Sequence, residues 1–212
     1  MQLWINISQD KVFLACGEER IFLERNGIED ILGETLVTLY RKYQFSEAYI
    51  LNGPWGFTNL RVGSLCLNLL NALEDNQISF FSFSKTELYQ YAYFQKKVPQ
   101  YGVLYIGQKR NVWLWDLDEN KQIGQFSFES LSEYFEKRRM QNYQYFLDTT
   151  YEDWYYPEEF DSQYAIDGEQ LFQLMQDFVK EKGKNLTPSH EVQAQYLMNP
   201  IITPTKKHFI HH

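Results

Sequence analysis

The chain has 212 residues, 44% hydrophobic and 17% aromatic, which suffices for one large domain or two small lobes with buried cores. Its 28 acidic and 20 basic residues give a net charge of −8, which disfavours direct nucleic-acid binding. The N-terminus does not resemble a signal peptide, and no apolar run approaches the roughly 20 residues of a membrane span. Cys16 and Cys66 are far apart, as is typical of reduced thiols. We therefore expect a soluble, cytoplasmic protein with no membrane partner.

The first half of the chain predicts a meander of three short strands, followed by helices and strands in alternation. Leu3, Ile5 and Ile7 show the two-residue period of a strand. The segment 28–43 has apolar residues on one side and charged residues on the other, as an amphipathic helix does. Ser84 is a typical N-cap. The predicted strands are 3–7, 12–16, 21–24, 48–51 and 78–83, and the predicted helices are 28–43, 58–73 and 85–93.

The second half predicts the same plan with a different sequence. Its strands are predicted at 103–106, 111–117, 123–126 and 143–147, and its helices at 131–140 and 168–181. The order strand-strand-strand-helix-strand-helix thus occurs twice, which favours an α/β protein of two related lobes. We expect lobes at 1–97 and 98–212 with a hinge near 96–100. The tail from residue 182 is expected to pack along the body as an extended segment.

A glycine turn between the fourth strand and the second helix is the first candidate site. A strand that enters a helix through such a turn is a common device for binding an anion. Gly53, Pro54 and Gly56 can adopt the required backbone angles, Thr58 is placed to cap the helix, and Arg61 lies in its first turn. The alternative is a tight turn with a capping threonine and a solvated arginine.

The helix that follows is the second candidate site, because it is apolar on most of its surface. Its polar residues form one narrow stripe: Arg61, Ser64, Asn68, Asn71 and Asp75. A helix that lies on a sheet needs only one apolar face. The additional apolar surface therefore requires another helix of this chain or another protein.

Other candidates are weaker. The loop 151–161 combines five acidic and five aromatic residues, and it is either a solvated cover or a docking surface for a basic partner. The four histidines lie in the C-terminal tail, at His190, His208, His211 and His212. They form no metal site on a scaffold and no catalytic triad, so we expect neither.

The turn and helix together resemble the signature of the TsaB (YeaZ) family, G-P-G-S-F-T-G-[LVI]-R-[IV]-G. Here the segment reads Gly53-Pro-Trp-Gly-Phe-Thr-Asn-Leu-Arg-Val-Gly63. It keeps the family residue at Gly53, Pro54, Phe57, Thr58, Arg61 and Gly63, and it departs at Trp55, Gly56 and Asn59. The strand at 4–8 matches the family's A-I-D-T-S with Asn6 in place of aspartate, and Tyr196-Leu197 matches its C-terminal Y-L-R with Met198 in place of arginine.

The resemblance implies a two-lobed, actin-like or ribonuclease H-like ATPase fold. It implies a non-catalytic subunit that binds and activates the metalloenzyme TsaD in tRNA threonylcarbamoyladenosine synthesis, with TsaE as a further partner and no cofactor. It implies contact with TsaD through the helices 28–43 and 58–73, and a homodimer when TsaD is absent. The expected interface residues are Ile28, Ile31, Leu32, Leu36, Leu39, Leu65, Asn68, Leu69, Ala72 and Leu73.

The departures from the signature bear on nucleotide binding. Asn6 is neutral and a poorer ligand for Mg²⁺ than aspartate, and Trp55 would crowd a phosphate. The expected nucleotide site is therefore degenerate, with residual ATP or ADP binding left open; its residues are Asn6, Ser8, Gly53, Pro54, Gly56, Thr58 and Arg61. The alternatives are a small actin-like ATPase or kinase that uses the turn at 53–61 for phosphate, and a diverged homodimer.

Overall fold

The computed structural model describes residues 1–9, 11–54, 57–105, 111–137, 144–150 and 164–194. The strands are β1 (Gln2–Asn6), β2 (Val12–Cys16), β3 (Glu19–Leu23), β4 (Glu47–Leu51), β5 (Ser79–Phe83), β6 (Tyr101–Tyr105), β7 (Asn111–Asp116), β8 (Lys121–Ser127), β9 (Tyr145–Asp148) and β10 (Tyr164–Ile166). The helices are α1 (Ile28–Tyr43), α2 (Phe57–Leu73), α3 (Lys85–Phe94), α4 (Phe128–Lys137) and α5 (Gly168–Lys182), and the short 3-10 helix η2 (Gly183–Asn185) follows α5. No helix in these ranges is long and apolar enough to cross a membrane.

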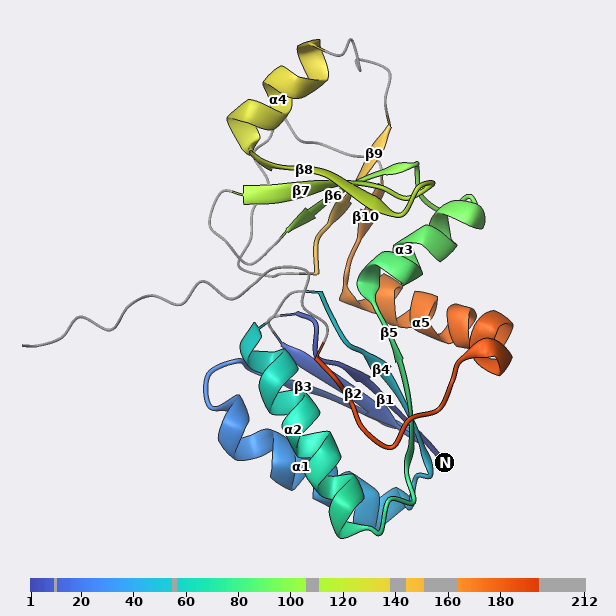
Figure 1. The fold of residues 1–212 in the computed structure, drawn as a ribbon. Coiled ribbons are helices and arrows are strands. Elements are labelled where there is room, and N and C mark those ends of the chain that lie inside the picture. The colour runs from blue at the N-terminus through green and yellow to red at the C-terminus, as the bar shows by residue number, and fades with distance from the viewer. Residues whose placement is uncertain (10, 55–56, 106–110, 138–143, 151–163, 195–212) are drawn as a thin grey trace, which may run out of the picture.

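The strands form two five-stranded mixed sheets of the same topology (Figure 1). The order is β3-β2-β1-β4-β5 in the first sheet and β8-β7-β6-β9-β10 in the second. In each, the first three strands are antiparallel, and the last two run parallel to the first. This confirms the predicted duplicated α/β fold.

Two elements of the second half differ from the prediction. The strand β10 was not predicted, because its three residues are too few to show a period. As a result α5 follows a fifth strand and corresponds to α3, whereas the prediction placed it at the position of α2. The helix α4 begins at Phe128 and not at Leu131, because the Ser127 hydroxyl accepts a hydrogen bond from the Ser130 amide at 3.2 Å and starts the helix earlier.

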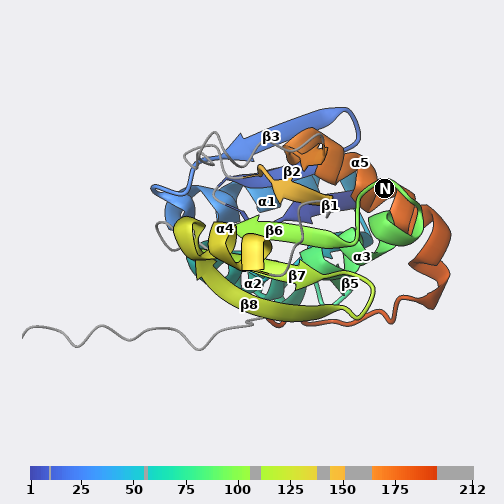
Figure 2. The ribbon, with the colours of Figure 1, turned by 90° about the horizontal axis from the view of Figure 1, so that it is seen from above.

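The helices lie in layers on and between the two sheets (Figures 1 and 2). Leu3 and Ile5 of β1 face the core beneath α1 and α2. The opposite face of the first sheet carries a row of aromatic side chains, Trp4, Tyr49 and Phe81, which are register partners on β1, β4 and β5. Adjacent rings in this row stack with centroids 4.8 and 5.1 Å apart. Phe172 of α5 packs edge-on against Trp4 at 6.1 Å, so a helix from the second half covers the first sheet.

The two halves share one core. Leu51 and Phe83 of the first sheet, helices α3 and α5, and Trp113 and Phe146 of the second sheet belong to a single cluster of buried side chains. The other face of the second sheet packs beneath α4 in a smaller cluster. Val98, at the predicted hinge, is buried in the shared core. The division of the chain at residue 97 stays a prediction.

A buried ion pair joins the halves at the start of α3. Ser84 is the N-cap of this helix, as predicted, and it forms a capping box with Glu87; Lys85 is the first residue of the helix. The Lys85 side chain is 0% exposed, and its Nζ donates to Asp148 Oδ2 at 3.1 Å and to Thr150 Oγ1 at 2.5 Å. Asp148 ends β9 and is also 0% exposed. The Lys85 backbone amide donates to the carbonyl of Gly53 at 2.8 Å, which connects this pair to the glycine turn.

Replacing Lys85 with methionine should be strongly destabilising, because it leaves the Asp148 carboxylate buried without its cation. We expect the free energy of unfolding in urea to fall by about 3–5 kcal/mol. The matched control is Lys97→Met, which removes the ion pair of Lys97 with Asp177, whose side chains are 48% and 33% exposed. That change should cost no more than about 1 kcal/mol. Equal effects of the two substitutions would contradict the role of the buried pair.

Candidate functional site

The described residues of the predicted glycine turn, Gly53 and Pro54, have a structural role. Gly53 has a φ of +92°, which favours glycine, and the Gly53–Pro54 peptide is cis. Both residues are buried. The helix α2 begins at Phe57, so Thr58 lies in its first turn and is not the N-cap that was predicted. Thr58 and Arg61 are exposed, whereas Gly56 lies outside the described residues.

Asn6 and Ser8 are brought together, and their polar atoms bind each other. The Ser8 amide and hydroxyl donate to Asn6 Oδ1 at 2.9 and 2.8 Å, and Asn6 Nδ2 donates to Gln9 Oε1 at 2.9 Å. The same geometry recurs after β9, where the amide and hydroxyl of Thr150 donate to Asp148 Oδ1 at 3.1 and 2.6 Å. In both places the side chain that ends a strand holds the loop that follows it.

Two further residues of the signature segment hold α2 against the sheet. A Cβ on Gly63 would lie 2.6 Å from Ile7 Cγ2, so only glycine lets the helix approach the end of β1 this closely. Asn59, where the family signature has glycine, donates from Nδ2 to the Gln9 carbonyl at 2.6 Å. The packing of α2 therefore explains both Gly63 and Asn59, and neither residue needs a bound phosphate to account for it.

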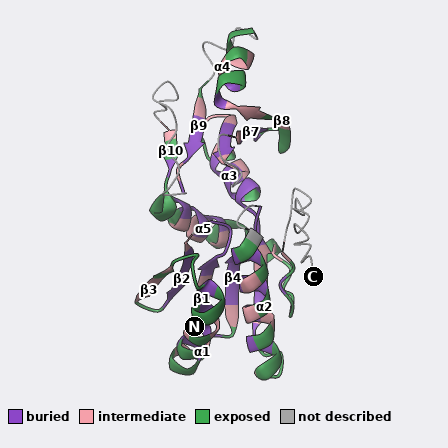
Figure 3. Cartoon of the chain, turned by 90° about the vertical axis from the view of Figure 1, so that its left-hand side faces the viewer, coloured by how far each residue is buried: buried purple, intermediate pink, exposed green. Residues whose placement is uncertain are grey.

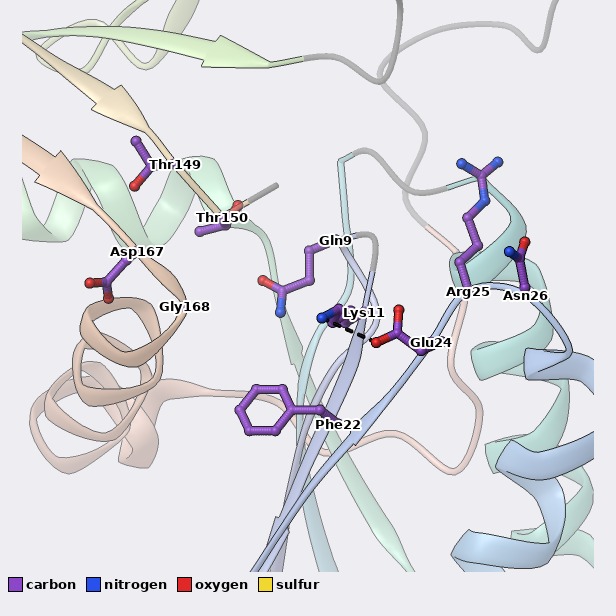
Figure 4. Close-up of a pocket in the computed structure, with 10 residues that line it drawn as sticks. All are labelled: Gln9, Lys11, Phe22, Glu24, Arg25, Asn26, Thr149, Thr150, Asp167 and Gly168. Atoms are coloured by element: carbon purple, nitrogen blue, oxygen red, sulfur yellow. Dashed lines mark ion pairs between the residues drawn. The ribbon is translucent and has the colours of Figure 1, made fainter. Parts of the chain in front are cut away.

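A cavity of about 670 Å³ lies where the two halves meet (Figure 4). Its lining residues come from four loops or strand ends: Gln9, Lys11, Phe22, Glu24, Arg25, Asn26, Thr149, Thr150, Asp167 and Gly168. None of the described residues of the predicted nucleotide turn is among them. The volume is in the range of small-molecule sites. The sequence did not indicate this site, since its residues are single polar side chains that only the packing of the halves brings together.

The charges in the cavity are of both signs. Lys11 Nζ is 3.1 Å from Glu24 Oε1, so its charge is partly balanced within the cavity. Asp167 caps α5 and accepts the Gln170 amide at 2.8 Å, so a carboxylate already occupies the positive end of that helix. An anionic ligand would meet the Glu24 and Asp167 carboxylates as well as Lys11 and Arg25. This balance suits a neutral polar ligand better than a triphosphate.

The helix α2 carries an exposed apolar row. Leu65, Leu69 and Leu73, each four residues from the next, are 67%, 57% and 68% exposed. Green, exposed stretches run along the outward side of α2 in Figure 3. Ala72 is exposed beside them, and Ile31 of the neighbouring α1 is 39% exposed. These five residues, all from the expected partner interface, are hereafter the leucine row.

The other expected interface residues lie elsewhere. Ile28, Leu32, Leu36 and Leu39 are fully buried in the core beneath α1, so their side chains have no surface to offer a partner. They were expected at the interface because the resemblance implied contact through this helix, and its amphipathic period does not show whether this chain or a partner covers the apolar face. Asn68 is half-buried and binds the C-terminal segment of this chain: its Oδ1 accepts the Val192 amide at 2.7 Å.

Other side chains of α2 pack against or bind other parts of this chain. Leu60, Leu67 and Leu70 enter the core of the first sheet. Cys66 packs partly buried against the same core, and burial raises the pKa of its thiol, as expected of an unreactive cysteine. Asn71 donates to the His190 carbonyl at 2.9 Å and accepts from the Ile78 amide at 2.8 Å. The predicted polar stripe is thus partly an internal binding surface. The loop 151–161 and the last three histidines lie outside the described residues.

Replacing Gly63 with alanine should destabilise the protein, because Ile7 or α2 must move to admit the added methyl group. We expect a loss of about 1–3 kcal/mol in the free energy of unfolding. Gly33→Ala is the matched control on α1, since the nearest atom, Cys66 Sγ, would be 3.8 Å from the new Cβ. It should stabilise the protein by about 0.5–1 kcal/mol, as expected of alanine in a helix. If the Gly63→Ala and Gly33→Ala variants have the same free energy of unfolding, α2 does not lie as close to β1 as the structure shows.

Comparison with known proteins places the fold. No protein-family model and no curated protein matches the chain. The structure is similar to YeaZ from Pseudomonas aeruginosa, with 15% identity, 91% of this chain and 96% of that chain covered, and a TM-score of 0.49. It is also similar to an uncharacterized protein with similarity to peptidase YeaZ from Pseudomonas aeruginosa, with 15% identity, coverage of 92% and 99%, and a TM-score of 0.51. The second comparison shows that the chain shares the two-lobed α/β fold of that YeaZ-like structure.

Proposed function

We propose that the chain is a non-catalytic scaffold subunit of the tRNA threonylcarbamoyladenosine modification complex, which binds and activates a TsaD homologue. TsaE is a further partner in this proposal, and the chain itself needs no cofactor. The observation that carries the proposal is the leucine row on α2. The YeaZ-like fold and the signature segment supply the identity of the partner.

The leucine row has the shape of a helix-packing surface. Side chains at i, i+4 and i+8 form a ridge that fits the groove of a second helix. Within the described residues, the large exposed side chains of Leu65, Leu69 and Leu73 form the one such series on a helix, while Phe22 and Phe94 stand singly. A contiguous apolar patch of this kind is typical of a protein interface. Ile31 extends the patch onto α1, so a partner would contact both helices.

The non-catalytic role is supported by how the signature residues are used. Asn6 and Ser8 bind each other, and Gly63 and Asn59 fit α2 to the sheet. A phosphate-binding turn would need its amides and hydroxyls free to meet the ligand. The packing role of these residues therefore favours a scaffold over an ATPase.

The double substitution Leu65→Glu with Leu69→Glu tests the proposed interface. It should weaken binding to the TsaD homologue of the same organism about 100-fold, since it buries unpaired carboxylates at the centre of the contact. Binding is measured by co-purification and by titration of the purified proteins. Phe94→Glu on α3 is the control, because Phe94 is 60% exposed away from the leucine row, and it should bind like the unaltered chain.

The outcome also separates a scaffold from a diverged homodimer. Without TsaD we expect a homodimer through the leucine row, which the double substitution converts to a monomer in solution mass measurements. If the unaltered chain dimerises but neither binds TsaD nor supports reconstituted tRNA modification, the scaffold proposal fails and the homodimer remains.

An ATPase or kinase is the second candidate function, and the cavity between the halves is the observation that favours it. Its 670 Å³ could hold a nucleotide, yet Glu24 and Asp167 would repel the phosphates. We therefore expect no saturable heat when Mg²⁺-ATP is titrated into the protein in a calorimeter. Saturable binding that Lys11→Ala weakens would favour the enzyme over the scaffold.

A further inference from the structure

The C-terminal segment returns from the second half to the first. Beyond η2 and Leu186, residues 187–194 run back beside α2 and β5, where the orange-red ribbon crosses the first sheet in Figure 1. We call these residues the strap. The strap adds an antiparallel bridge to the open edge of β5, where Phe80 and Ser189 exchange both backbone hydrogen bonds, at 2.8 and 2.9 Å.

The first half holds the strap by its main chain. On α2, Asn68 Nδ2 donates to the Val192 carbonyl at 3.1 Å while its Oδ1 accepts the Val192 amide, and Asn71 donates to the His190 carbonyl. At the end of β4, Asn52 Nδ2 donates to the Gln193 carbonyl. These hydrogen bonds and the two of the bridge at Ser189 all end on backbone atoms of the strap.

Side chains of the strap contribute little beyond one anchor. Val192 is 3% exposed and joins the core cluster of the first sheet, and Ala194 packs partly buried against the same cluster. The side chains from Thr187 to Glu191 are exposed. Ser189 shapes the segment itself, since its hydroxyl accepts the Glu191 amide at 3.1 Å and donates to the Glu191 carbonyl at 2.8 Å.

We propose that α2 and β5 form a binding groove for an extended peptide, and that the strap occupies this groove in its own chain. The groove selects an extended backbone through the amides of Asn52, Asn68 and Asn71 and through the edge of β5. The groove discriminates between side chains at one position, because the apolar site that Val192 occupies fits a small β-branched side chain. Adding an extended segment to a sheet edge while a pocket reads one side chain is an established mode of peptide recognition.

This groove is distinct from the surface of the proposed function. Asn68 and Asn71 belong to the polar stripe of α2, whereas the proposed partner contacts the leucine row. The strap also pairs with the edge of β5 at Phe80, whose backbone groups would otherwise be open to another chain. The groove therefore ties the end of the second half to the first sheet and protects that edge.

A peptide in solution tests the groove in the full-length protein. Val192→Asp should release the strap, because the new carboxylate cannot enter the apolar site. A fluorescent peptide of residues 186–194 should then bind this variant saturably, as measured by anisotropy. It should not bind the unaltered chain, whose own strap has the higher effective concentration. Adding Asn68→Ala to the variant should weaken peptide binding at least tenfold, and a peptide with aspartate at the valine position should not bind.

The leucine row provides the control for independence from the proposed function. Peptide binding should be unchanged when Leu65→Glu and Leu69→Glu are added to the Val192→Asp variant. Loss of binding in that case would overturn the inference, because it would place the peptide on the leucine row. Failure of a folded Val192→Asp variant to bind the peptide would overturn it too.

A second measurement keeps the inference testable if Val192→Asp does not fold. In the otherwise unaltered chain, Asn68→Ala removes the acceptor of the Val192 amide, and hydrogen exchange of that amide should become at least tenfold faster. The Ser82→Ala variant, at a half-buried position of β5, is the control and should leave this exchange rate unchanged. Equal protection of the Val192 amide in Asn68→Ala and the unaltered chain would show that the groove does not hold the strap.

Discussion

The first sheet is apolar on both faces, so it must be covered twice. The helices α1 and α2 cover the face that carries Leu3 and Ile5. The aromatic row of Trp4, Tyr49 and Phe81 on the other face is covered by α5, which comes from the second half. Aromatic side chains bury more apolar surface than other residues, so separating the halves would expose a large area to water. The buried pair of Lys85 and Asp148 lies within this contact and needs the same arrangement.

The packing of the rest of the chain around α2 determines which of its side chains stay exposed. This helix meets a different environment on each side: the sheet core, α1, the strap and solvent. Some of its leucines therefore pack into the core of the first sheet, and the others form the exposed leucine row. Asn68 and Asn71, which lie between these leucines, bind the backbone of the strap through their side-chain amides. A single helix thus combines packing on the sheet, hydrogen bonds to the strap and an exposed apolar row.

The described residues of the signature segment position two helices in this structure. Gly53 adopts a positive φ and accepts the Lys85 amide, while Gly63 lets α2 lie against Ile7. Both roles concern the position of α2 and α3. The polar cavity lies nearby, between loops of the two halves, but it is lined by residues outside the motif. Similarity in the motif therefore indicates the fold and the placement of α2 more directly than it indicates phosphate binding.

The sequence by itself determined the local elements. The bounds of α1 follow from its amphipathic period, the start of α3 from the Ser84 cap, and the duplicated α/β plan from two meanders, each followed by helices and strands. These features depend on neighbours along the chain, so they can be read from it. The strand β10 is too short to show a period, and it was missed.

Only the tertiary structure decided which surfaces remain free. Ile28 and Leu65 look alike in sequence, yet one is buried beneath α1 and the other is 67% exposed. The cavity, the pair of Lys85 with Asp148 and the contact of Asn68 with Val192 join residues that are far apart in the chain. Such contacts depend on how the two halves pack, and a periodic pattern shows that a face is apolar without showing what covers it.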